Sequence, residues 1–242
     1  GLVVQNDLYG SDFFSCFKAV LQYFEKLEIT EVVIKAMPTI FTSQAAEELQ
    51  YLAFICEAKL TRCDLHACIN FNQPYRVSKS VIRDCNQTLK KLQLQVKKSD
   101  DLELFWNTLL IPNLHEAHQA KPVHNLDEIL MLKTKFPENI SFFGCYQQND
   151  LIGGVVIFET PTVAHCQYIS GTKQLNKLLG LSVLMQSVIS YYSDKKMYFN
   201  FGTSNENQGK NINSGLLTWK EKFGARNVSQ PFYSFKTTSY FK

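Results

Sequence analysis

The sequence lacks the marks of a membrane-spanning or disulfide-stabilised protein. It has no uninterrupted apolar run of about 18 residues, which predicts no transmembrane helix. The N-terminus shows no basic stretch followed by an apolar block, which predicts no signal peptide. The cysteines are odd in number and irregularly spaced, with no C-x-x-C pair: Cys16, Cys56, Cys63, Cys68, Cys85, Cys145 and Cys166. We therefore expect reduced, buried thiols in a cytoplasmic protein rather than a disulfide framework or a zinc site.

Several catalytic signatures are also missing. The chain has no P-loop, no Rossmann glycine pattern and no Gly-x-Ser-x-Gly. His115, Glu116 and His118 invite a metal interpretation, but His-x-x-His lacks the i, i+4 spacing of a zinc-binding helix. His124 follows only after Pro122. We therefore predict no metal site.

The composition that is present favours a folded chain with a sizeable core. Hydrophobic residues make up 45% and charged residues 19% of the 242 residues, which suits one large or two moderate domains. The net charge of +3 is unevenly distributed, because residues 170–242 hold ten Lys and Arg against three Asp and Glu. Such a basic region favours an anionic ligand such as a phosphate, although a solvated lysine face would have the same composition.

The spacing of apolar residues predicts alternating helices and strands. In the first half we expect a short strand at 1–6, helices at 12–27, 44–56 and 78–92, a strand at 31–41 and one or two strands within 59–71. In the second half we expect strands at 93–97, 140–146, 151–158, 162–170, 196–201 and 231–235. Helices are expected from about residue 100 to 109 and at 126–135, 178–192 and 213–223, with Ser11 or Asp12 capping the first helix of the chain.

The second half resembles a known fold. Three antiparallel strands, a helix, a strand, a helix and a strand follow the order of the GNAT superfamily, with residues 151–158 and 163–170 resembling its central strands. Residues 198–204 (YFNFGTS), 213–216 (NSGL) and 219–225 (WKEKFGA) resemble the closing block of Fem-type aminoacyl transferases, a branch of that superfamily. The resemblance covers residues 78–242 well and residues 1–77 in outline.

The resemblance implies an α/β (α+β) fold of two GNAT-like subdomains, each a mixed, mostly antiparallel sheet flanked by helices. The first subdomain, residues 1–92, would be incomplete, and residues 93–242 would form the acyltransferase domain. The implied activity is transfer of an acyl or aminoacyl group from acyl-CoA or aminoacyl-tRNA to an amine acceptor, such as a cell-wall precursor. These donors are substrates, and no permanently bound cofactor is implied. Two alternatives remain: a non-catalytic GNAT-like module that binds an anionic ligand, and non-specific nucleic-acid binding through the basic last third.

The resemblance also implies candidate site residues. Lys220, the lysine of the aromatic-Lys-x-x-Phe-Gly motif, would lie near the transferred group and stabilise developing negative charge; otherwise it is a surface lysine. Residues 172–182 occupy the place of the loop that holds the CoA pyrophosphate, and Lys173, Lys177 and Gly180 are the cofactor-binding candidates. That segment departs from Gln/Arg-x-x-Gly-x-Gly/Ala, because it has a single glycine and leucines where small residues are needed. An ordinary strand-to-helix turn is the alternative.

Four residues are candidates for binding substrate. Tyr168 lies on a predicted strand, and Asn200, Ser204 and Asn205 lie at or beyond the end of another, where ligands bind in open α/β sheets. Asn and Ser also form turns readily, which is the competing interpretation. Strict alternation along the strand predicts that His165 and Tyr168 point to opposite faces.

Overall fold

The computed structural model describes residues 1–5, 7–177 and 179–240, and the side chains of all of these except 117, 118 and 177. Contacts within the chain divide it into two compact units. The smaller unit comprises Gly1–His66, Thr203–Ser214 and Asn227–Lys242, and the larger comprises Ala67–Gly202 and Gly215–Arg226.

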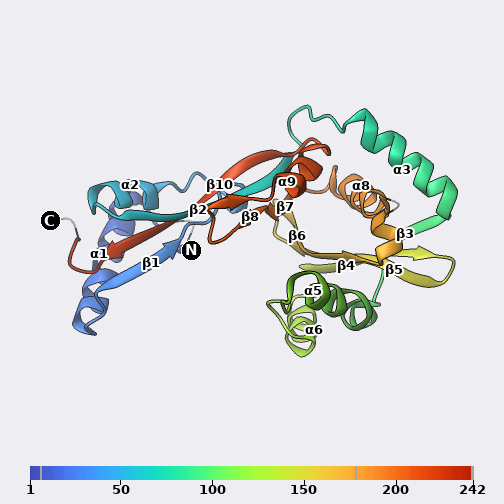
Figure 1. Cartoon of the computed structure of the whole chain (residues 1–242). Helices are drawn as coiled ribbons and strands as arrows, with labels where there is room; N and C mark the ends of the chain where they lie inside the picture. Colours follow the sequence, from blue (N-terminus) through green and yellow to red (C-terminus); the bar gives the residue numbers. More distant parts are fainter. Residues whose placement is uncertain (6, 178, 241–242) are drawn as a thin grey trace. The chain divides into compact units, whose positions relative to one another are not determined.

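The larger unit is built on a mostly antiparallel sheet (Figure 1). Its strands run in the order β7-β6-β5-β4-β3. The pairs β3–β4, β4–β5 and β5–β6 are antiparallel, and the pair β6–β7 is parallel. The strands are β3 (Leu94–Lys98), β4 (Ile140–Gln147), β5 (Asp150–Glu159), β6 (Val163–Gly171) and β7 (Tyr198–Thr203). The helices are α3 (Lys79–Leu92), α4 (Leu102–Phe105), the π-helical turn η2 (Trp106–Leu110), α5 (Ile111–His118), α6 (Leu126–Lys135), α7 (Lys173–Lys177), α8 (Gly180–Tyr192) and α9 (Ser214–Glu221).

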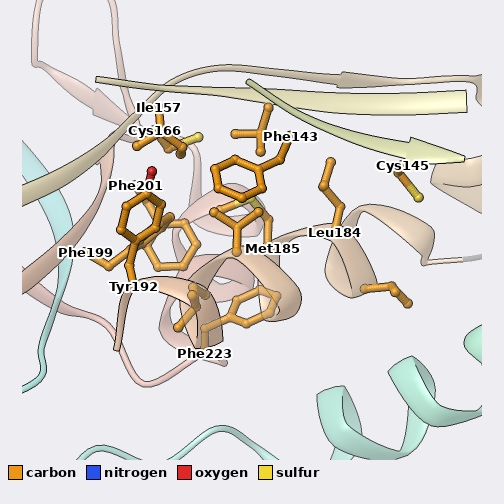
Figure 2. Close-up of a cluster of buried hydrophobic side chains, with 14 of the residues drawn as sticks. Phe143, Cys145, Ile157, Cys166, Leu184, Met185, Tyr192, Phe199, Phe201 and Phe223 are labelled. Atoms are coloured by element: carbon orange, nitrogen blue, oxygen red, sulfur yellow. The ribbon is translucent and has the colours of Figure 1, made fainter. Parts of the chain in front are cut away.

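Helices cover both faces of this sheet. On one face lie α5 and α6, and on the other lies α8 (Figure 1). The α8 face holds the larger core, which includes Phe143, Ile157, Cys166 and Met185 (Figure 2). The opposite face holds a second core around Trp106. Because the central strands are covered on both faces, β4 is buried over nearly its whole length.

A β-bulge interrupts the alternation of β6. Ile157 pairs with Cys166 and Val156 with Tyr168, so Gln167 is an extra residue in β6. As a result Cys166 belongs to the core on the α8 face, whereas Tyr168, two residues later, belongs to the core around Trp106. The bulge therefore exchanges the two faces of β6 halfway along the strand.

The smaller unit contains the two ends of the chain. One sheet of this unit has the strand order β1-β10-β2, from β1 (Glu31–Lys35), β10 (Arg226–Lys236) and β2 (Lys59–Asn70), of which the part up to His66 belongs to this unit. A separate two-stranded sheet is formed by β8 (Asn205–Glu206) and β9 (Asn211–Ile212). Its helices are α1 (Gly10–Lys26), the short 3-10 turn η1 (Thr39–Phe41) and α2 (Glu48–Ile55). Phe17 of α1 packs on Phe235 of β10, with ring centroids 5.0 Å apart, in the core of this unit.

The predicted fold class, a mixed and mostly antiparallel sheet flanked by helices, is confirmed. Some local expectations were wrong. Residues 1–5 form no strand. Helix α1 begins after Tyr9 with no side-chain cap, so neither Ser11 nor Asp12 caps it. All seven cysteines are free, but Cys16 is exposed and Cys63 half-buried, so burial holds only for the other five.

Two predictions concern larger features. The predicted boundary between residues 92 and 93 lies inside the larger contact unit; it concerned two related subdomains rather than contact units, and it stays a prediction. In the described part of the chain, no helix is both long and apolar enough to cross a membrane.

Candidate functional site

Lys220 is a buried lysine on α9. Its side chain is 4% exposed, and Nζ donates a hydrogen bond to the carbonyl oxygen of Gly202 at 3.1 Å. Burial lowers the pKa of Lys220 to about 8, against a smaller opposing effect of the Cys166 thiol. The ammonium is therefore still the main form at neutral pH, but it is held at a cost that a surface lysine does not have.

The residues on either side of Lys220 fix its helix in place. Trp219 Nε1 donates to Ser182 Oγ of α8 at 3.1 Å, and the Phe223 side chain is fully buried. Gly224 ends the segment with φ +93°, a conformation that glycine adopts without strain. The aromatic and Phe-Gly residues of the aromatic-Lys-x-x-Phe-Gly motif thus pack α9 against its surroundings, and the lysine adds one buried charge.

Lys220 reaches the place where two parallel strands separate. Strands β6 and β7 are paired over three residues each, from Val163 to His165 and from Tyr198 to Asn200, although both strands continue further. Gly202 lies on β7 and Cys166 on β6, each beyond the last paired residue. Burial raises the pKa of the Cys166 thiol to about 12, so this neighbour of Lys220 is neutral. We call this separation, bounded by Cys166, Asn200, Gly202 and Lys220, the strand opening.

Asn200 shapes the β7 side of the strand opening. It is fully buried, and its Oδ1 accepts a hydrogen bond from the Gly202 backbone N–H at 2.9 Å. Gly202 has φ +76°, so it turns the chain with the left-handed geometry that glycine tolerates. Asn200 thereby holds the carbonyl that Lys220 contacts, and these two predicted site residues are brought together.

Tyr168 lies on the other face of the sheet, in the core around Trp106. Its ring centroid is 4.9 Å from that of Trp106, and its hydroxyl accepts a hydrogen bond from the His124 backbone N–H at 3.2 Å. The same hydroxyl is 2.7 Å from His124 Nδ1. Tyr168 therefore ties the segment before α6 to the sheet, and it is 8% exposed.

The expectation that His165 and Tyr168 point to opposite faces was wrong. His165 pairs with Phe158 and Tyr168 with Val156 across β5, and Phe158 and Val156 are two residues apart on an unbulged stretch, so they share a face. The bulge at Gln167 supplies the extra residue that brings His165 and Tyr168 to this same face. No signal in the sequence marks the bulge, because residues 163–171 remain an ordinary apolar and polar mixture.

Ser204 and Asn205 lie in the smaller unit, where they organise the loop after β7. Asn205 Oδ1 accepts from the Leu65 backbone N–H at 2.7 Å and from Thr203 Oγ1 at 2.8 Å, and Nδ2 donates to the Gly209 carbonyl at 3.2 Å. Ser204 is buried, and its carbonyl accepts from the Asn213 N–H at 2.9 Å. The hydrogen bonds of Asn205 fit the satisfied-turn interpretation.

The segment after β6 is closed by its own side chains. Thr172 Oγ1 accepts from the Leu175 N–H at 3.2 Å and the Thr172 carbonyl accepts from the Asn176 N–H at 3.0 Å, so α7 is a hydrogen-bonded turn. Leu175 is 1% exposed. A Cβ added to Gly180 would lie 2.0 Å from a Leu175 methyl carbon, so the glycine is required by leucine packing. A pyrophosphate needs N–H groups that point outward, and these two are used internally.

Lys173 and Lys177 are the two basic cofactor-binding candidates of this segment. Lys173 Nζ forms an ion pair with Glu116, and both side chains are largely exposed. The Lys177 side chain lies outside the described residues. Lys173 and Glu116 line a pocket of about 450 Å³, in which Asn113 Nδ2 donates to Ser170 Oγ at 2.7 Å and to the Gly171 carbonyl at 2.8 Å. Its apolar walls are Leu110, Leu114, Ile169 and Leu181.

The histidines and carboxylates considered as metal ligands do not converge. Among the residues that the structure describes, no group of three His, Cys, Asp or Glu side chains could hold a metal ion. His124 instead makes its hydrogen bond to Tyr168, and the His118 side chain lies outside the described residues.

The fold of this chain has relatives among solved structures. No protein-family model matches the sequence, and no curated protein matches it significantly. Solved structures match its fold. FemX superimposes with a TM-score of 0.70 at 10% identity, over 98% of this chain and 79% of FemX. The C-terminal domain of a putative lysylphosphatidylglycerol synthetase from Agrobacterium fabrum gives 0.66 at 9%, over 93% and 73% of the two chains. L-PGS from Bacillus licheniformis gives 0.66 at 10%, over 94% and 74%. The Fem-type resemblance read from the sequence is therefore confirmed for the fold.

Proposed function

We propose that this protein is an N-acyltransferase that transfers an acyl or aminoacyl group from an activated donor to an amine, with Lys220 at the reacting carbonyl. The observation that carries the proposal is the buried Lys220 ammonium at the strand opening. Keeping a charge in a buried position costs free energy, and a buried ionisable group with a strongly shifted pKa is a candidate for a functional role.

Lys220 would act electrostatically. When an amine attacks the carbonyl carbon of the donor, the carbonyl π electrons move to oxygen and a negative charge develops there. The Lys220 ammonium, oriented by the Gly202 carbonyl at 3.1 Å, is a preorganised donor for that charge. The buried surroundings strengthen the interaction because they lower the local dielectric constant. Orientation of donor and acceptor in the strand opening supplies the rest of the rate enhancement.

Of the two donor classes, the segment after β6 favours aminoacyl-tRNA over acyl-CoA. Leu175 fills the space beside Gly180, and the Leu175 and Asn176 N–H groups bond to Thr172. In aminoacyl-tRNA the activated group is an ester of a ribose hydroxyl. This donor therefore does not need outward-pointing N–H groups that hold a pyrophosphate, which this segment does not offer. The lysylphosphatidylglycerol synthetase domain with a similar fold is named for a product that carries a lysyl group, which agrees with an aminoacyl donor. A cell-wall precursor that carries a free amine is the acceptor class that the Fem-type resemblance suggests.

The test is a matrix of donors and acceptors. Purified protein is incubated with acetyl-CoA or with a mixture of charged tRNAs, each with and without a nucleotide-linked muramyl peptide. New amides are detected by mass spectrometry, and donor binding is measured by calorimetry. We expect amide formation with charged tRNA and none above background with acetyl-CoA. If neither donor binds, the enzyme proposal is wrong.

A second candidate function is a non-catalytic module that binds an anionic ligand. The observation in its favour is again the segment after β6, whose N–H groups bond to Thr172 and do not point outward. Such a segment is also expected in a GNAT-like protein that no longer catalyses acyl transfer. Binding of a donor or of inorganic phosphate without amide formation, and without any effect of Lys220→Met on that binding, is the outcome that would favour it.

A further inference from the structure

We infer that the exposed face of α3 is a docking surface for the sugar-phosphate backbone of RNA. This inference rests on the proposed function, because the proposed donor is an ester of RNA. A concentration of positive charge points to it. Residues 76–98 hold seven Lys and Arg against one acid, Asp84, a net charge of +6 in a chain whose total is +3. Lysines on the edge strand β3 also prevent pairing between sheets, so α3 is the part that needs an explanation.

The cations of α3 form a row on the side of the helix away from the core. Lys79, Arg83 and Lys90 are exposed, and each lies two residues from a buried one, about 200° around the helix. The row is about 16 Å long at 1.5 Å per residue. The opposite side of α3, which packs against α8 (Figure 1), carries the buried residues Val81, Cys85, Thr88 and Leu92.

Helix stability does not explain the beginning of this row. Ser78 caps α3, with its Oγ accepting from the Val81 N–H at 3.3 Å, so Lys79 is the first helical residue. The first turn contains no acid, and a cation there is unfavourable beside the partial positive charge of a helix N-terminus. Lys79 and Arg83 are also like charges four residues apart, which destabilises a helix. Only the two lysines of the last turn suit the helix dipole.

Partners within the chain neutralise little of this charge. Arg83 pairs with the adjacent Asp84 at 3.1 Å, but the Arg83 side chain is still 66% exposed. Lys79 and Lys90 form no ion pair with any residue that the structure describes. Helix α6 differs, because it has two acids in its first turn and two lysines in its last, as a solvated helix usually does. The face of α3 is therefore unbalanced in charge.

The row begins beside the segment that carries Lys220. The Ser78 backbone N–H donates to the carbonyl of Lys222, two residues after Lys220, at 2.7 Å. A Cβ added to Gly224 would lie 3.1 Å from the carbonyl oxygen of Arg76, an exposed cation just before α3. The start of α3 is thus fixed to the chain just after α9. An RNA that lies along α3 can therefore bring one end towards Lys220.

The exposed face suits a nucleic-acid backbone better than a lipid surface. Each strand of duplex DNA carries a charge about every 3.4 Å along the axis, so a row of about 16 Å faces roughly five phosphates of a similar strand. Asn86 and Gln87 are exposed between the cations, and such amides bind phosphate oxygens. Ile82 and Leu89 are 48% and 39% exposed. A helix at a membrane surface, however, turns its main apolar face to the lipid, and that face of α3 is buried in the core.

The experiment compares two double variants that lose the same charge. Lys79→Gln/Arg83→Gln removes the start of the row, and Lys121→Gln/Lys135→Gln removes two exposed lysines elsewhere in the same unit. Binding of labelled, uncharged tRNA is followed by fluorescence anisotropy between 50 and 200 mM salt. We expect the α3 variant to bind at least tenfold more weakly at 50 mM salt, with a salt slope smaller by about two, and the control to bind like the wild-type protein.

Two further measurements separate lost charge from lost folding. The exchange Lys79→Arg/Arg83→Lys keeps both charges and should bind tRNA like the wild-type protein. The Tm of Lys79→Gln/Arg83→Gln should not fall, because the change removes a like-charge pair. Equal affinity of the α3 variant and the control, or no binding of tRNA by the wild-type protein, overturns the docking surface. Tighter binding to phosphatidylglycerol vesicles than to tRNA, lost in the α3 variant, assigns the face to lipid and overturns it as well.

Amide formation with charged tRNA distinguishes this surface from the proposed function. We expect kcat/KM for charged tRNA to fall in the α3 variant by the same factor as the affinity. If the wild-type protein binds tRNA through α3 but forms no amide, the acyltransfer is wrong and the surface stands. If amides form with equal kcat/KM in the α3 variant and the control, the surface is wrong and the acyltransfer stands.

Discussion

The strand opening and the segment that follows β6 lie on the same sheet and differ in how their polar groups are used. In the segment, Thr172 binds two N–H groups and Leu175 fills the space beside Gly180. In the strand opening, a buried ammonium donates to the Gly202 carbonyl at 3.1 Å and its pKa is lowered. The first region is arranged for stability and the second at the expense of stability. We therefore expect mutations in the segment after β6 to lower the free energy of unfolding, and mutations in the strand opening to lower the rate of amide formation.

The largest effect is expected from Lys220→Met. It removes the charge and keeps much of the volume, so amide formation should fall about 100- to 1000-fold, the cost of losing an oxyanion donor. At pH 7 the free energy of unfolding should stay the same or rise, by up to roughly 3 kcal/mol, because the buried charge is gone. The control is Lys222→Met, at a neighbouring exposed lysine, which should change neither the rate of amide formation nor the free energy of unfolding. Steady-state kinetics and urea unfolding measure the two, and a large loss of stability in Lys220→Met would contradict this account.

Leu175→Ala should show the opposite profile. Removing a fully buried leucine costs about 2–5 kcal/mol of unfolding free energy, while amide formation by the folded fraction should change little. Gly180→Ala alone forces a Cβ against Leu175 and should also destabilise, but less so in the Leu175→Ala background, where the space exists. The double-mutant cycle by urea unfolding checks this; additive effects would mean that the two residues do not share the space.

The pH dependence of stability should report Lys220 directly. Its pKa is lowered from 10.5 to about 8 in the folded state, so between these values the unfolded chain binds more protons. The free energy of unfolding of the wild-type protein, relative to Lys220→Met, should therefore rise as the pH increases from 8 to 10.5, by roughly 3 kcal/mol in all. Below pH 8 the difference should be constant. Taking the difference between the proteins cancels the other thiols and phenols, and a flat difference would mean that Lys220 is not desolvated.

The smallest effect is expected from Glu116→Gln. This change removes the ion pair with Lys173, both of whose side chains are largely exposed. Exposed pairs contribute about 0–1 kcal/mol, less in salt, so we expect a shift near the limit of detection in urea unfolding at 150 mM salt. The same variant leaves Lys173 unpaired, so tighter binding of inorganic phosphate in calorimetry would show that this lysine is an anion site that Glu116 masks.

Much of the second half of the fold could be predicted, because its strands have long apolar runs and clear turns. The three strands β4 to β6 and helix α6 lie at or within two residues of the expected ranges. Lys220 was identified by a motif whose aromatic, lysine and Phe-Gly spacing survives, and its burial follows from the packing of Trp219 and Phe223.

The rest depended on information that local pattern does not carry. The role of Asn205 could not be seen, because its partner Leu65 is 140 residues away in the sequence. His165 was expected on the face opposite Tyr168, because alternation assumes a regular ladder. The π-helical turn at Trp106–Leu110 also has no mark in a sequence that reads as an ordinary amphipathic helix.

The bulge in β6 constrains how this protein can diverge. Deleting Gln167 would restore a regular ladder and leave every other residue of β6 on its present face, because Cys166 and Tyr168 would become neighbours and already lie on opposite faces. Substitutions in β6 can be absorbed one side chain at a time, whereas a one-residue insertion or deletion away from the bulge would move the residues on one side of it to the other layer of helices. Relatives should therefore differ in the length of β6 at the position of Gln167 more readily than anywhere else along the strand.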